Sequence, residues 1–242
     1  MNFAPGAWRY AIVPLLAAPF AFLFSVSLSA VALALGLGTL AFFRDPERTP
    51  PPTGVVAPAD GKVSVIRSEG AQCRLGTFMN VHNVHVVRAP FDATVLEVDH
   101  APGGYKPAFS KDSDRNEKVH LRLQPARQHV DSTEDVEAPD PEPDSGSTEV
   151  TFIAGAFARR IHPYVEAGEE LERGQRIGHI AFGSRVDVLF PPDVTATDLA
   201  VEPGEKVTAG ETRLLEPGSG SELGGSLIDD NGSPFDHEDP AE

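Results

Sequence analysis

The chain has 242 residues, a formal net charge of -16 at pH 7 and one cysteine, Cys73. This length suits one catalytic domain with appendages. The strong negative charge argues against a nucleic-acid partner, because a phosphate backbone binds basic surfaces. A lone cysteine excludes a disulfide within the chain and a cysteine metal site, so Cys73 is expected to be a small buried residue.

The N-terminal part is apolar, since residues 11–43 contain no charged side chain. One continuous helix of that length would measure about 50 Å, whereas a hydrocarbon core is about 30 Å thick. Two helices at residues 10–24 and 28–43 fit better. Basic residues at both ends, Arg9 and Arg44, then lie on one side, which the positive-inside rule makes cytoplasmic.

We therefore expect residues 1–43 to form a membrane-associating helical hairpin, with the catalytic domain on the cytoplasmic side of the cell membrane. A cleaved signal peptide ending near Ser29, a single pass and a hairpin lying in the membrane plane are the alternatives.

Residues 44–215 are predicted to form a mainly β domain of the α+β class, a compact β-sandwich or barrel-sandwich with few helices. After a proline-rich stretch at 44–53, short β-type runs alternate with Gly, Pro, Asp and Asn. The expected strands are residues 54–57, 62–67, 77–79, 83–88, 93–100, 118–122, 149–154, 158–162, 175–182, 185–190 and 195–201.

Two acidic segments, residues 124–148 and 216–242, are rich in Asp, Glu, Pro, Ser and Gly. They contain too few large apolar residues to offset chain entropy, so we expect a disordered insert and a disordered tail. Such acidity is typical of a salt-adapted proteome, in which charges are strongly screened, or of an ordinary solubilising tail.

An internal similarity links residues 165–174 (VEAGEELERG) and 201–210 (VEPGEKVTAG). Biotinyl and lipoyl carrier domains use this pattern of two glycine turns in a flattened β-barrel. The similarity favours a barrel-sandwich core, although turn chemistry also recurs wherever strands recur. It does not indicate a carrier, because neither copy presents a lysine in a hairpin.

Three local motifs could carry chemistry. Asp60 precedes a glycine after a strand, which taken alone is a common turn. His82 and His85 lie in an apolar run that favours a strand, where residues three apart face opposite sides. They could share a site only across a bulge or turn near Asn83, and no metal site is expected. The pair Gly183 and Ser184 separates two predicted strands.

Taken together, these motifs resemble the phosphatidylserine decarboxylase family, specifically its short archaeal-type branch. The resemblance covers residues 42–191. Lys118 stands where the family pattern has arginine after Asn-Glu. The matching blocks are residues 42–48 (FFRDPER), 58–62 (PADGK), 81–88 (VHNVHVVR), 115–117 (RNE), 154–161 (AGAFARRI), 173–178 (RGQRIG) and 182–185 (FGSR).

The resemblance implies a proenzyme that cleaves itself between Gly183 and Ser184. Asp60 would orient His85, and His85 would take the proton of the Ser184 hydroxyl as that oxygen attacks the Gly183 carbonyl. Ser184 would become a covalent pyruvoyl group, the only cofactor expected. A β chain, 1–183, and an α chain, 184–242, would remain associated.

The resemblance also implies that the pyruvoyl carbonyl forms a Schiff base with a serine phospholipid and that carbon dioxide leaves. His82 would supply the proton that replaces it. Arg88, Arg159 and Arg160 could hold the lipid phosphate, or could neutralise nearby carboxylates.

The acidic composition and the family branch favour archaetidylserine as the substrate, with phosphatidylserine otherwise. Family members that look dimeric suggest a homo-oligomer. The alternatives are a membrane-tethered lipoyl-like adaptor without catalysis and a pyruvoyl decarboxylase that acts on a soluble amino acid.

Overall fold

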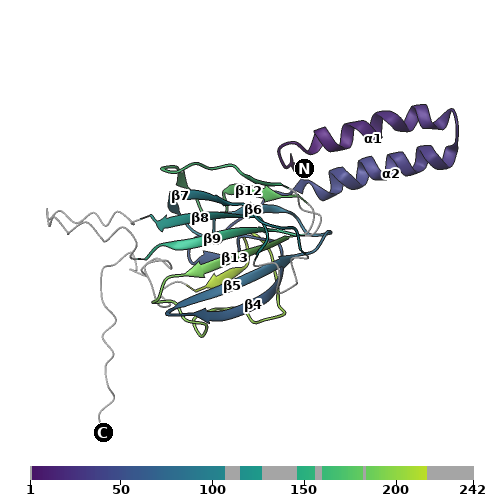
Figure 1. Cartoon of the computed structure of the whole chain (residues 1–242). Coiled ribbons are helices and arrows are strands. Elements are labelled where there is room, and N and C mark those ends of the chain that lie inside the picture. Colours follow the sequence, from purple (N-terminus) through teal and green to yellow (C-terminus); the bar gives the residue numbers. More distant parts are fainter. Residues whose placement is uncertain (1, 107–114, 127–145, 156–159, 182–183, 217–242) are drawn as a thin grey trace, which may run out of the picture.

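The computed structural model describes residues 2–106, 115–126, 146–155, 160–181 and 184–216. It consists of a β domain from which a pair of antiparallel helices protrudes (Figure 1). The predicted mainly β architecture is therefore confirmed.

The protruding pair consists of α1 (Ala7–Phe22) and α2 (Val26–Phe42). Ser25 caps α2, because its side chain accepts a hydrogen bond from the backbone N–H of Leu28. The helices pack closely at Gly36, where an added Cβ would lie 2.5 Å from the side chain of Leu15. The predicted hairpin is confirmed, although both helices begin earlier than expected.

Much of the hairpin surface is apolar and exposed. Phe24, at the tip, is 85% exposed, and the other exposed large apolar side chains along the hairpin range from 43% to 78%. Within the described ranges, no helix has both the length and the hydropathy that a membrane crossing requires. The exposed apolar side chains are Trp8, Tyr10, Ile12, Val13, Leu16, Phe20, Phe22, Leu23, Phe24, Val26, Leu28, Val31, Leu33, Leu35 and Leu37.

The β domain is built on a curled eight-stranded sheet with the order β11-β7-β8-β9-β13-β5-β4-β14. A three-stranded sheet, β10-β12-β6, and two-stranded pairs, β15-β3 and β1-β2, complete it. The strands are β1 (Asn2–Phe3), β2 (Arg44–Asp45), β3 (Val55–Val56), β4 (Gly61–Glu69), β5 (Gln72–Met79), β6 (Val86–Arg88), β7 (Ala93–Ala101), β8 (Lys118–Pro125), β9 (Thr148–Ala154), β10 (Ile161–Pro163), β11 (Glu170–Leu171), β12 (Arg176–Ile180), β13 (Ser184–Phe190), β14 (Lys206–Val207) and β15 (Arg213–Leu215).

The expected strand at 195–201 is wrong. Both the backbone N–H and the hydroxyl of Thr195 donate to the Asp198 carboxylate, at 2.8 and 2.7 Å, and close a turn there. The boundaries of the acidic insert are also too wide, because Gln124 lies in β8 and Thr148 begins β9. The predictions of disorder for the rest of the insert and for the tail fall on residues 127–145 and 217–242, outside the described ranges.

The two similar segments have matching backbone conformations. Gly168 and Gly204 have φ of 89° and 96°, and Gly174 and Gly210 have φ of 77° and 74°. These left-handed values favour glycine. The N–H groups of Gly174 and Gly210 donate to the carbonyls of Ala89 and Ala57, each at 2.8 Å. The predicted internal repeat is therefore a real structural duplication.

The duplication extends to a second pair of segments that sequence reasoning did not link, 55–63 (VVAPADGKV) and 87–95 (VRAPFDATV). Asp60 accepts a hydrogen bond from the N–H of Ala209, and Asp92 accepts one from the N–H of Arg173, each at 2.8 Å. Asp60 and Asp92 thus occupy equivalent turns.

Two apolar clusters organise the domain. The large one fills the curled sheet with residues such as Phe91, Phe152 and Phe190. The smaller one lies at the base of the hairpin, where Ala4, Ala7, Phe42 and Phe43 pack with Val84, Val86 and Ala181. The hairpin is therefore anchored beside the segments that lead to His85 and Ser184.

Candidate active site

Ser184 is the first residue of β13, in the interior of the eight-stranded sheet. It pairs with Met79 of β5 on one side and with Ala154 of β9 on the other. It is 0% exposed, and its hydroxyl donates to the Met79 sulfur at 3.1 Å. Gly183, the other residue of the predicted cleavage pair, lies outside the described residues.

His85 lies directly before β6 and is 2% exposed. A turn brings it there, because the N–H of Asn83 donates to the carbonyl of Asn80 at 2.9 Å. This is the turn near Asn83 that the sequence required if His82 and His85 were to share a site. The carbonyl of His85 accepts from the N–H of Ile180 at 3.1 Å, so His85 borders the strand that leads towards Ser184.

The His85 ring is neutral near pH 7. Burial, with smaller contributions from the charges of Arg44 and His82, lowers its pKa from 6.5 to about 4, although a hydrogen bond to Asn83 acts the other way. Nδ1 lies 3.0 Å from the carbonyl oxygen of Asn83, which can only accept, so Nδ1 carries the proton. Nε2 then holds the lone pair, as a general base requires.

Asp60 is held by partners that the sequence did not indicate. Arg48 donates to both carboxylate oxygens, at 2.9 and 3.2 Å, in addition to the bond from Ala209. Among the described residues, Asp60 makes no hydrogen bond to His85. The triad pairing of Asp60 with His85 therefore remains a prediction, and the carbonyl of Asn83 is one group that orients the His85 ring.

His82 is exposed on the same turn, and its carbonyl accepts from Arg44 at 2.6 Å. Its imidazole is near enough for its charge to act on His85.

The three predicted phosphate-binding arginines differ. Arg88 is buried and donates to Asp45 at 2.7 Å and to the carbonyl of Gly174 at 2.9 Å, a structural arrangement. Arg160 is exposed, and its carbonyl accepts from Ala181 at 3.3 Å. Arg159 falls outside the described ranges.

Sequence reasoning assigned no role to a second aromatic group beside this site. His162 and His179 pair across β10 and β12, with their rings stacked and the centroids 4.6 Å apart. The Tyr164 hydroxyl lies 2.6 Å from Nδ1 of His179. The ring of Phe42 contacts His85 at a centroid distance of 4.3 Å, and the ring of Phe43 contacts His179 at 5.9 Å. The base of the hairpin thus covers both histidines.

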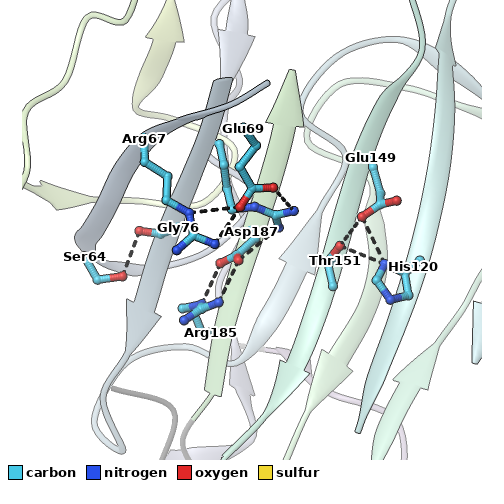
Figure 2. A network of polar contacts seen from close by, with 10 residues as sticks. Ser64, Arg67, Glu69, Gly76, His120, Glu149, Thr151, Arg185 and Asp187 are labelled. Carbon is cyan, nitrogen blue, oxygen red and sulfur yellow. Dashed lines mark hydrogen bonds and ion pairs between the residues drawn. The ribbon is translucent and has the colours of Figure 1, made fainter. Parts of the chain in front are cut away.

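Other charged residues of the sheet form polar networks around Asp187 and Glu149 (Figure 2). Asp187 is 0% exposed and accepts from Arg185 at 2.7 and 2.9 Å and from Arg74 at 3.2 Å. Glu149 accepts from Thr151 at 2.7 Å and lies 3.0 Å from Nδ1 of His120. In the part of the chain that the structure describes, no cluster of His, Cys, Asp or Glu has a metal-binding arrangement.

Comparison with known proteins agrees with this geometry. The model of the phosphatidylserine decarboxylase family matches residues 35–214. A putative archaetidylserine decarboxylase proenzyme of Halobacterium salinarum is 47% identical over 211 residues, which cover 87% of this chain and 96% of that protein. A phosphatidylserine decarboxylase proenzyme of Streptomyces griseus is 44% identical over 178 residues, 73% of each chain.

A putative archaetidylserine decarboxylase proenzyme of Methanococcoides burtonii is 41% identical over 177 residues, which cover 72% of this chain and 73% of that protein. The match to the family model spans the hairpin base, the turn with His85 and the strand that begins at Ser184. The chain therefore belongs to the phosphatidylserine decarboxylase family, a family of decarboxylase enzymes.

Proposed function

We propose that this chain is a proenzyme that cuts itself between Gly183 and Ser184 and then decarboxylates a serine phospholipid with a pyruvoyl group derived from Ser184. The observation that carries the proposal is the junction itself. A buried serine begins an interior strand, and a neutral histidine lies beside the strand that leads to it. The family membership supports the same reading.

In the cleavage step, His85 takes the proton of the Ser184 hydroxyl, and Oγ bonds to the carbonyl carbon of Gly183. The peptide C–N bond breaks, which leaves an ester and a free amine on residue 184. Loss of the α-proton of residue 184 then expels Gly183 as a carboxylate. The resulting enamine tautomerises to an imine. Water adds to the imine carbon, and ammonia leaves.

The surroundings of Ser184 suit a group that must stay in place after the chain is cut. Backbone pairing with β5 and β9 runs from Ser184 along the strand, so the new terminus keeps its register. When present, the pyruvoyl group supplies an electron-withdrawing carbonyl that accepts the electrons released as carbon dioxide leaves. Ser184, from which the group derives, is buried beside Met79.

Two histidines would then have separate tasks. His85, buried and neutral, moves the proton in the cleavage step. His82, exposed on the preceding turn, delivers a proton to the substrate carbon once carbon dioxide has left. From the family resemblance, we infer that Asp60 stabilises the positive charge that His85 gains during cleavage; in the uncut chain, its carboxylate pairs with Arg48.

The hairpin gives the reason for a lipid substrate. Its exposed apolar side chains favour burial in a bilayer interface, and its base packs next to His85. We infer that it holds the site at head-group depth. The acidic composition and the similarity to the Halobacterium protein favour archaetidylserine over phosphatidylserine.

The mass of the purified protein tests the cleavage. We expect two chains, and the smaller one should start with a pyruvoyl group in place of Ser184. The Ser184→Ala variant should remain one chain of 25.8 kDa without decarboxylase activity. A wild-type protein that stays intact would instead favour the non-catalytic adaptor, and normal cleavage of Ser184→Ala would move the junction elsewhere.

A further inference from the structure

The arginines of this acidic protein differ in whether a carboxylate neutralises them. Most of those that the structure describes pair with a carboxylate, as Arg48, Arg88 and Arg176 do. The described arginines without such a partner are Arg9, Arg44, Arg115 and Arg160. Arg44 donates to the carbonyls of Ala41 and His82, whereas Arg9 and Arg160 have no hydrogen-bonding partner for their guanidinium groups among the described residues.

Arg9 and Arg160 are far apart in sequence but share one neighbourhood. Burial is the largest cause that lowers the pKa of His162, and the positive charges of Arg160 and Arg9 lower it further. Arg160 precedes His162 by two residues on the chain, and Arg9 lies next to Tyr10 at the base of the hairpin. Among the described residues, neither guanidinium group has a carboxylate partner, so the two add local positive charge in a protein whose net charge is -16.

This neighbourhood borders the proposed active site. The backbone of Arg160 accepts from Ala181, the last described residue before Ser184. Tyr10, next to Arg9, stacks on Phe43 with ring centroids 5.5 Å apart, and Phe43 contacts His179. His179 in turn stacks on His162. The two arginines thus lie where the hairpin joins the β domain.

His179 and Tyr164 hold the His162 ring in place. Burial raises the pKa of Tyr164, so its hydroxyl stays protonated. Burial lowers the pKa of His179 to about 4, so Nδ1 of this neutral ring can accept the Tyr164 hydrogen at 2.6 Å. With His179 fixed, the stacked and half-buried ring of His162 has a defined orientation.

We propose that Arg9 and Arg160, with His162 beside them, form the subsite that binds the phosphodiester of the lipid substrate. This inference rests on the proposed function and adds the residues that recognise the head group. In a serine phospholipid, the phosphodiester lies between the reacting serine and the lipid tails. A subsite between Ser184 and the hairpin base is where that group must pass.

The chemistry of the subsite fits a phosphodiester. Arginine forms forked, charge-assisted hydrogen bonds to phosphate oxygens. A neutral imidazole adds a hydrogen-bond donor without adding a third positive charge that the two arginines would repel. Most of the protein would repel an anionic lipid, so two unpaired guanidinium groups at the hairpin base would also favour entry from that side.

The test is Arg160→Gln, which removes the fork and the charge and leaves a shorter, neutral amide. After normal cleavage, we expect KM for the serine lipid in detergent micelles to rise about tenfold, with kcat changed less than about threefold. Arg67→Gln is the matched control. Arg67 is exposed, pairs with Glu69 and lies towards the far end of β4 from the row that contains Ser184.

Two soluble inhibitors isolate the phosphodiester. Glycerophosphoethanolamine contains it, and ethanolamine offers the same amine without it. In wild type, the first should inhibit at a much lower concentration than the second. The ratio of the two inhibition constants should fall about tenfold in Arg160→Gln and in Arg9→Gln, stay unchanged in Arg67→Gln, and recover partly in Arg160→Lys, which retains the charge.

An unchanged ratio in both arginine variants, with normal cleavage, would overturn the subsite and leave the decarboxylase intact. A wild-type protein that is never cleaved would overturn the proposed function instead. In that case, calorimetric titration of the intact chain with glycerophosphoethanolamine still decides the subsite, because binding by wild type must exceed binding by Arg160→Gln about tenfold. Arg9→Gln, at the exposed start of α1, serves if Arg160→Gln does not fold.

Discussion

His85 acts in the proposed cleavage only while its ring is neutral, so the pH dependence of cleavage reports its surroundings. An ordinary histidine is half protonated near pH 6.5, whereas the pKa of His85 is about 4 because the ring is buried close to Arg44 and His82. The folded protein should therefore keep the basic form well below pH 6.

We predict that the initial rate of self-cleavage stays nearly constant from pH 8 to pH 5 and falls to half near pH 4. Freshly refolded chain transferred to each pH, with mass spectrometry of the products, measures it. His82→Ala removes a nearby positive charge and should shift the midpoint slightly upwards. A midpoint near 6.5 in the wild type would mean that a less buried group takes the Ser184 proton.

Asp60 could act as a turn residue or as a charge in the cleavage step, and a comparison with the equivalent residue Asp92 separates the two roles. Its bond from Ala209 has a counterpart at Asp92, which accepts from Arg173 at the same 2.8 Å. An asparagine at either position can still accept that bond through its amide oxygen, so both substitutions remove mainly the charge. Only Asp60 belongs to the proposed cleavage machinery.

We predict that Asp60→Asn slows cleavage about ten- to a hundredfold, because loss of a carboxylate that favours the imidazolium by about 1–2 pKa units costs about 1.4 kcal/mol per unit. Asp92→Asn should cleave at the wild-type rate, because that carboxylate pairs with Arg173 in the other half of the duplication. A time course of chain separation on denaturing gels compares the two. Equal rates would leave Asp60 as a turn residue only.

At the scale of elements, local patterns predicted most of the fold. Strands such as β8 and β9 follow from short β-rich runs between turn residues, and the hairpin follows from an uncharged stretch with serines at its middle. The prediction of a strand at residues 195–201 failed because β-branched side chains there favour a strand locally. In the structure, a hydrogen bond from the Thr195 hydroxyl to the Asp198 carboxylate forms a turn instead.

Contacts between distant segments could not be predicted in this way. The motif with Asp60 was visible, but its partner Arg48 depends on how the exit from the hairpin folds back onto the domain. The stacked His162 and His179 depend on the register of β10 and β12. The second pair of similar segments, 55–63 and 87–95, was missed because they share only the Val-x-Ala-Pro-x-Asp pattern. The equivalent hydrogen bonds in the structure show that the two segments correspond.

The duplication also explains how the edges of the sheet are positioned. β11 and β14 are its two outermost strands, and each follows one of the equivalent glycine turns. The N–H of Gly168 donates to Val95, and that of Gly204 donates to Val63, at 2.7 and 2.8 Å. The two halves thus close the sheet at both sides, while β13 lies in its interior.

At the scale of the whole molecule, cleavage would leave two chains that must stay together around one site. The break falls beside an interior strand, so the short chain remains paired with β5 and β9, which belong to the long chain. One buried ion pair also crosses between them: Arg74 donates to Asp187 at 3.2 Å, with side chains that are 16% and 1% exposed. Asp187 thus links the products of cleavage.

We predict that Asp187→Asn lowers the free energy of unfolding by about 1.5–3 kcal/mol, because Arg74 and Arg185 lose charged hydrogen bonds to a buried carboxylate while Arg74 keeps its bond to Glu69. In the cleaved protein, the short chain should dissociate at a lower urea concentration than in wild type. The matched control is Glu97→Gln, which breaks the pair with Arg122 between side chains that are 53% and 40% exposed and should cost less than about 1 kcal/mol. Urea titrations followed by size-exclusion chromatography measure both, and equal midpoints for the two variants would show that backbone pairing alone retains the short chain.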